Sequence, residues 1–138
     1  MILVDAGPLV AVCDPRDRLN QTALRDLDRL TKRQLVVCDP VLTEACFHLP
    51  HRPQRERLLR FLAEFAVRGH ECADPAGFRL EVFAWLLRYE EHTPDLADGY
   101  LVVASAQDRS ARVWTYDGDF QTVWRRPDGT RIPLATAR

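Results

Sequence analysis

The chain has 138 residues, of which 46% are hydrophobic, and this is the size of a single domain with one continuous core. Its formal net charge is -1, from 19 basic and 20 acidic residues, so overall charge does not indicate a nucleic-acid-binding protein. No apolar run approaches the roughly 20 residues that span a bilayer, and the N-terminus lacks a signal-peptide pattern. We therefore expect one cytoplasmic domain over residues 1–138, with no membrane association.

Short apolar runs rich in β-branched residues predict the strands. In chain order, the runs that fit strands cover residues 1–4, 35–38, 71–73, 111–116 and 130–134. The pattern is weakest at the third of these runs. Pro133 cannot donate to a neighbouring strand, so the last run is expected at an edge of the sheet.

Apolar residues at helical spacing predict several helices between these strands. In chain order, the predicted helices cover residues 17–32, 39–49, 54–67, 78–91 and 94–109. A turn at Gly7-Pro8 begins another helix after the first strand, and residues 120–124 fit one helical turn. Asp39 is expected to cap the helix whose first turn holds Pro40. Apolar strands that alternate with helices favour an α/β fold with a parallel sheet covered on both faces.

Three aspartates follow predicted strands. Asp5 ends the first strand, and Asp117 and Asp119 follow the strand over residues 111–116. Ligands bind at the carboxyl ends of parallel strands in doubly wound folds, so these carboxylates are candidate site residues. Structural explanations stay open: Asp5 could accept hydrogen bonds from turn amides, and Asp117 with Gly118 could form an Asp-Gly hairpin turn.

Two further acids lie in helical segments that are too apolar for a solvent-facing helix. Glu44 is one, and an unpaired carboxylate there would cost several kcal/mol unless an arginine pairs with it. Asp98 precedes the apolar residues 100–106, and Asp95 lies three residues earlier. Thr93 is the expected cap of this helix, which makes Asp95 a first-turn charge and places Asp98 beyond the cap positions.

Carboxylates gathered in one place repel each other, and a hard divalent cation is their natural counter-charge. Oxygen-only ligands favour Mg²⁺ or Mn²⁺ over zinc. A zinc cluster of Cys46, His48 and His51 is disfavoured because Pro50 interrupts their helical spacing. The four cysteines have no CxxC spacing and are expected as free thiols of a reducing compartment. A phosphatase or receiver site that uses an aspartate nucleophile is disfavoured because Lys32, the only lysine, is poorly placed.

Four stretches of the sequence resemble motifs of the PIN-domain ribonucleases, and in particular of the VapC-type toxins of bacterial toxin-antitoxin pairs. The similar stretches, which follow the family's order and intervals, are residues 2–11, 42–45, 95–99 and 115–120. One departure is Gly99, where the family more often has Ala. The resemblance assigns an acidic quartet, a further candidate metal ligand and a hydroxyl that orients the last acid; these are Asp5, Glu44, Asp98 and Asp117, then Asp119, then Thr115.

The resemblance implies a single PIN-like domain whose parallel sheet has the strand order 3-2-1-4-5. It also implies a Mg²⁺- or Mn²⁺-dependent endoribonuclease, an RNA substrate, a homodimer and a small antitoxin partner. A housekeeping RNA-processing nuclease and a non-catalytic RNA- or protein-binding module remain as alternatives. Four arginines near the expected site are candidate phosphate contacts, and these are Arg16, Arg18, Arg125 and Arg126.

Overall fold

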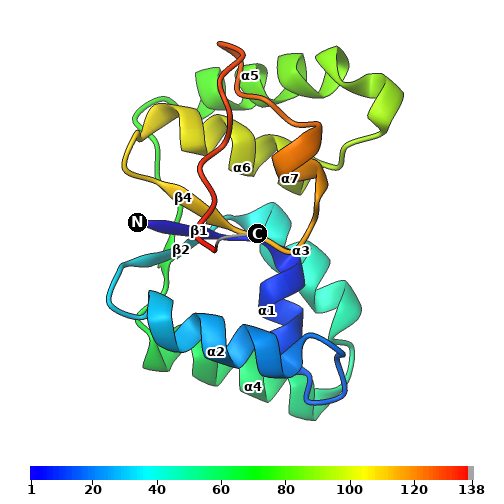
Figure 1. Ribbon diagram of the computed structural model, residues 1–138, viewed down its shortest axis with the longest axis vertical. Helices are drawn as coiled ribbons and strands as arrows, with labels where there is room; N and C mark the ends of the chain where they lie inside the picture. Colours follow the sequence, from blue (N-terminus) through cyan, green and yellow to red (C-terminus); the bar gives the residue numbers. More distant parts are fainter. Residues whose placement is uncertain (137–138) are drawn as a thin grey trace.

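The computed structural model describes residues 1–136 and contains a four-stranded parallel sheet with helices on both faces (Figure 1). The strands pair in the order β3-β2-β1-β4. Their bounds are Ile2–Val4 for β1, Leu35–Val37 for β2, Arg68–Gly69 for β3 and Arg112–Trp114 for β4. The predicted α/β class and parallel pairing are confirmed.

Helices α1, α2 and α4 cover one face of the sheet, and α5, α6 and α7 cover the other (Figure 1). Helix α3 contacts both α1 and α6, so it joins the two layers. The helices are α1 Ala6–Cys13, α2 Asn20–Leu30, α3 Asp39–His48, α4 Arg52–Glu64, α5 Pro75–Arg88, the 3-10 turn η1 Glu90–His92, α6 Leu96–Gln107 and α7 Asp119–Thr122. No helix within residues 1–136 is both long and apolar enough to cross a membrane.

The central strand β1 is buried on both faces, as expected for a strand inside a parallel sheet. Ile2 and Val4 have no exposed surface, and Trp114 of β4 is equally buried beside them. On the α5 side, Trp85 and Trp124 pack edge to face with ring centroids 5.2 Å apart. This core fixes the strand ends from which the candidate site residues extend.

Gly99 lets α6 approach α5 closely. A Cβ atom at this position would come within 3.0 Å of Val82 Cγ1 and 3.2 Å of Leu86 Cδ2. Such contacts are tighter than ordinary packing, so an alanine would require the Val82 and Leu86 side chains to shift by a few tenths of an ångström. The departure from the family pattern at Gly99 therefore has a packing explanation in this chain.

The prediction of a fifth strand over residues 130–134 is wrong. Leu134 forms only an isolated parallel bridge with Val113, outside the four strands. The Val113 amide donates to Pro133 O at 2.9 Å, and the Ala135 amide donates to Val113 O at 2.8 Å. Pro133 has no N–H group, which removes a donor from any longer ladder at this edge.

Two boundaries also differ from the prediction. The third strand lies at Arg68–Gly69 and not at residues 71–73, and both of its residues are exposed, so no apolar run marks it. Cys38, and not Asp39, is the N-cap residue of α3; Asp39 is the first residue of the helix. Neither difference moves Glu44 from its helix.

Candidate active site

Asp5 lies between β1 and α1, where it is the N-cap residue of the helix. Its Oδ1 accepts a hydrogen bond from the Ala6 amide at 2.8 Å, and its Oδ2 accepts one from Thr115 Oγ1 at 2.7 Å. Only 8% of the residue is exposed. Burial raises the pKa of Asp5 to about 6, although these two hydrogen bonds oppose the rise. The carboxylate is therefore fixed in position and costly to ionise.

Thr115 connects Asp5 to the segment that follows β4. Its hydroxyl donates to Asp5 and accepts a hydrogen bond from the Asp117 amide at 3.0 Å. Asp117 in turn accepts a bond from the Asp119 amide at 2.9 Å, and Gly118 leads into α7. The alternative of an Asp-Gly hairpin turn is therefore wrong. The same Thr115 hydroxyl therefore bonds the side chain of Asp5 and the backbone of Asp117.

Asp95 and Asp98 form reciprocal side-chain to backbone hydrogen bonds at the start of α6. Asp95 is the N-cap residue, and its Oδ1 accepts from the Asp98 amide at 2.9 Å. Asp98 Oδ2 accepts from the Asp95 amide at 3.1 Å, which completes a capping box. The expected cap at Thr93 is wrong, and so is the inference that Asp98 lies beyond the cap positions.

The capping box brings two carboxylates together. Burial is the largest cause that raises the pKa of Asp98 to about 8, and the charge of Asp95 is the next. More distant contributions come from Asp5 and Asp117. A Ser or Thr in place of Asp95 would cap the helix without repelling Asp98. The aspartate at this position therefore destabilises the first turn of α6 electrostatically.

Glu44 faces the same acids from α3. Burial is the largest cause that raises the pKa of Glu44 to about 7, and the charges of Asp95, Asp5 and Asp117 contribute to the same rise. The side chain is half-buried. Among the described residues, the one salt bridge joins Arg52 to Glu56 at 2.8 Å. Glu44 therefore lacks the arginine partner that would have given its carboxylate a purely structural role.

Two aspartates whose roles the sequence leaves open, Asp95 and Asp119, differ in their effect on the other acids. Asp95 belongs to the cluster, because its charge raises the pKa of Asp5, Glu44 and Asp98. Asp119 does not contribute to any of these three pKa shifts. The three-residue interval between Asp95 and Asp98 is the sequence feature that could have identified the capping box.

A cavity of about 570 Å³ opens beside the cluster, between α3 and the start of α6. Asp39, Glu44 and Asp95 supply its charge, and Phe47 and Leu96 are among its apolar walls. The cavity therefore offers negative charge on one side and hydrocarbon on the other.

Arg125 and Arg126, which are candidate phosphate contacts, form hydrogen bonds within the protein. Arg125 donates to Trp124 O at 2.8 Å, and Arg126 donates to Ser105 O at 2.8 Å. Both side chains therefore satisfy backbone carbonyls of the fold. Arg16 lines another cavity with His51 and Arg57, away from the acids.

The donor set fits a hard divalent cation, because every charged group of the cluster is a carboxylate and no cationic side chain of residues 1–136 pairs with it. The side chains do not converge on one point: no group of three or more His, Cys, Asp or Glu residues within residues 1–136 is arranged to hold a metal ion. The proposed zinc ligands Cys46, His48 and His51 do not form such a group either, and all four cysteines are free thiols.

Comparisons with known proteins identify the fold. No protein family model matches the chain, and no curated protein matches it. Among solved structures, it is similar to VapC20 from Mycobacterium tuberculosis, a sarcin-ricin loop cleaving toxin. The TM-score is 0.68 at 21% sequence identity, over 88% of this chain and 94% of the VapC20 chain. This likeness shows a shared fold, and the resemblance to VapC-type PIN domains is confirmed at that level.

The raised pKa values predict how stability depends on pH when divalent cations are removed. The folded values are about 6 for Asp5, about 7 for Glu44 and about 8 for Asp98, against ordinary values of 3.8, 4.5 and 3.8. At pH values between the ordinary pKa and the folded pKa of each group, the folded chain binds more protons than the unfolded chain. The free energy of unfolding therefore falls as pH rises. In excess EDTA, we expect the Tm to drop from about pH 5 to about pH 8.

Asp98→Asn provides the control for this experiment, because an amide does not titrate. The variant should show a shallower fall in Tm over the same window. A wild-type Tm that rises from about pH 5 to about pH 8 in EDTA would contradict the assignment of shared, uncompensated carboxylates.

Proposed function

We propose that this chain, which has the fold of VapC-type PIN domains, is a metal-dependent endoribonuclease that hydrolyses RNA phosphodiester bonds. The observation that carries the proposal is the set of carboxylates at the ends of β1 and β4 and in α3 and α6, which have no cationic partner in residues 1–136. Burial and the charges of neighbouring acids raise the pKa of three of them, Asp5, Glu44 and Asp98. Carboxylates with a purely structural role are normally paired with a cationic side chain or exposed to solvent, whereas the carboxylates of a metal-dependent nuclease are unpaired until they bind a metal ion.

We infer that the four acids of the quartet, Asp5, Glu44, Asp98 and Asp117, hold one or two Mg²⁺ or Mn²⁺ ions. Bound there, the cation would lower the pKa of a water molecule and neutralise charge on the phosphate oxygens. Asp119 remains a prediction as a further ligand. Its established contact is the hydrogen bond from its amide to Asp117.

The chain's own residues supply position. The Thr115 hydroxyl fixes one oxygen of Asp5 and the backbone that carries Asp117. The capping box fixes the first turn of α6 and hence the Asp98 carboxylate. These bonds hold the acids near one another despite their repulsion, which is the preorganisation that a metal-assisted hydrolysis requires.

The likeness to VapC20, a sarcin-ricin loop cleaving toxin, supports RNA as the substrate class. Together with the resemblance in sequence, it also supports the role of toxin in a toxin-antitoxin pair, with a small antitoxin partner and a homodimeric assembly. A housekeeping RNA-processing nuclease would use the same site and is the second candidate.

Replacing one acid tests the nuclease proposal. Asp98→Asn should lower RNA cleavage at least about 100-fold, because removal of a mere outer-shell partner already costs roughly 10–100-fold at metal sites. The matched control is Asp28→Asn, an exposed aspartate on α2. Cleavage of an RNA panel with Mg²⁺ or Mn²⁺ is the measurement, and the Tm confirms folding.

Relief of repulsion should leave the Asp98→Asn variant at least as stable as the wild type when no metal is added. Wild-type rates of cleavage by this variant, or full activity of the wild type in excess EDTA, would contradict the proposal.

Co-expression tests the toxin role. The chain alone should arrest growth when it is induced, and the product of an adjacent small reading frame should co-purify with it and restore growth. The Asp98→Asn variant should bind the same partner without arresting growth. If the wild-type chain cleaves RNA but neither arrests growth nor retains the neighbouring product, the housekeeping candidate is the better account.

A further inference from the structure

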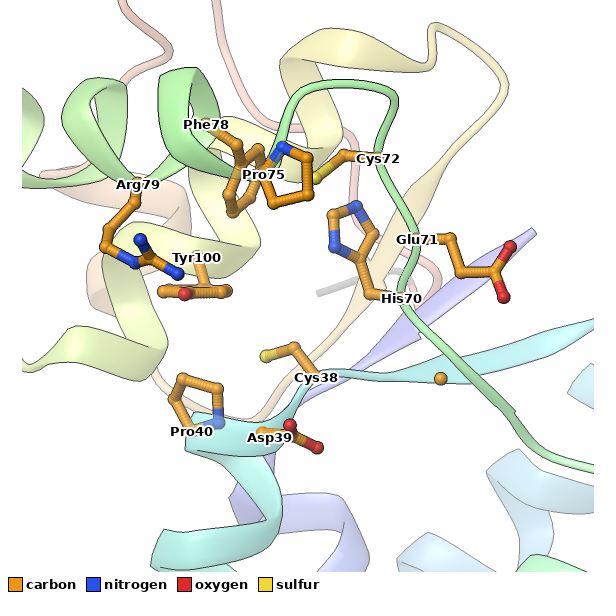
Figure 2. A pocket seen from close by; sticks show the side chains of 11 residues that line it. Cys38, Asp39, Pro40, His70, Glu71, Cys72, Pro75, Phe78, Arg79 and Tyr100 are labelled. Atoms are coloured by element: carbon orange, nitrogen blue, oxygen red, sulfur yellow. The ribbon is translucent and has the colours of Figure 1, made fainter.

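A second cavity, of about 480 Å³, adjoins the candidate active site (Figure 2). Its walls come from the end of β3 and the segment that follows it, from Cys38 and the start of α3, from the start of α5, and from Tyr100 of α6. Asp39, Pro40 and Tyr100 line this cavity and also the one that holds Glu44 and Asp95. The two cavities are therefore neighbours, and the volume lies within the range of small-ligand sites.

Aromatic rings line the new cavity. Tyr100, which is half-buried, contacts Phe78 with ring centroids 5.1 Å apart, and Phe78 contacts His70 at 5.0 Å. Phe78 is only 3% exposed, so it supports the other two rings from behind. Tyr100 and His70 are left as accessible ring surfaces, the kind on which unpaired bases stack.

Two polar side chains enter the cavity without a partner. Neither the Arg79 guanidinium nor the His70 imidazole makes a hydrogen bond or ion pair with the described residues 1–136. Figure 2 shows Arg79 and Tyr100 on one side of the cavity and His70 on the other, whereas the Glu71 carboxylate points away. Burial lowers the pKa of His70, so its neutral ring offers one donor and one acceptor.

A metal site is not a better explanation of this cavity. Cys38, His70 and Cys72 all line it, but they do not form a group that could hold a metal ion. Burial also raises the pKa of the Cys38 thiol to about 11, which keeps it protonated. The accessible chemistry is therefore an aromatic surface with nitrogen donors and, at the start of α3, the Asp39 carboxylate as an acceptor.

We propose that this cavity is a subsite for one unpaired nucleobase of the RNA substrate, next to the phosphodiester that reaches the acid cluster. The base stacks on Tyr100, and Arg79 donates hydrogen bonds to its edge. Guanine is the expected base, because its O6 and N7 acceptors match the fork of a guanidinium. The inference rests on the proposed function for its substrate class.

Binding without cleavage tests the subsite separately from catalysis. In excess EDTA, the wild-type chain should bind a fluorescein-labelled oligouridylate that contains a single G about tenfold more tightly than the all-U oligomer, as measured by fluorescence anisotropy. Arg79→Ala should reduce this preference to about twofold or less, and His70→Ala should reduce it in part.

Arg60→Ala is the matched control, because Arg60 is an exposed arginine of α4 on the opposite face of the sheet (Figure 1). This change should leave the preference for G intact and only slightly weaken the binding of both oligomers. The Tm of each variant shows that a loss of preference is not a loss of fold.

The outcomes separate this inference from the proposed function. Base preference lost in Arg79→Ala, in a chain that cuts no RNA with Mg²⁺ or Mn²⁺, would support the subsite and reject the nuclease. Cleavage by the wild type together with identical base preference and cleavage positions in Arg79→Ala and His70→Ala would overturn the subsite and leave the nuclease standing. Equal binding of all oligomers by the wild type would also overturn it.

Discussion

Repulsion among neighbouring carboxylates, of which Asp5 is buried and Glu44 and Asp98 are half-buried, is the constraint on which the rest of the site depends. Asp5 and Asp98 are held by hydrogen bonds that fix their positions, yet burial and neighbouring acids make both harder to ionise. Those bonds come from the Thr115 hydroxyl and from backbone amides, which add no positive charge. The hydrogen bonds therefore leave the repulsion among the carboxylates uncompensated, and either protonation or a bound cation would relieve it.

The parallel sheet explains how residues more than a hundred positions apart share this repulsion. Strands β1 and β4 lie side by side and end together, so Asp5 and Thr115 meet directly. Helix α3 contacts both α1 and α6, which brings Glu44 towards the start of α6. The same junction of β3, α3, α5 and α6 encloses the second cavity, so a base pocket beside the acids follows from one topology.

The sequence predicts these features unequally, for physical reasons. The apolar run before Asp5 marks β1, and the wholly apolar surroundings of Glu44 mark it as unusual. In contrast, β3 at Arg68–Gly69 is exposed and polar, so no hydrophobic pattern reveals it. The role of Asp95 depends on which residue caps α6, a boundary that propensity alone places within a few residues. The pairing of Tyr100 with Phe78 joins separate helices and is visible only in the folded chain.

The central claim is that the clustered carboxylates form a divalent-cation site, and anomalous diffraction from crystals soaked in Mn²⁺ tests it most directly. The account predicts one or two strong peaks within ligand distance, about 2.0–2.3 Å, of oxygens from Asp5, Glu44, Asp98 and Asp117. Fully soaked crystals that show no peak at these residues, with Asp98 and Glu44 instead protonated and hydrogen-bonded to neighbouring acids, would contradict it.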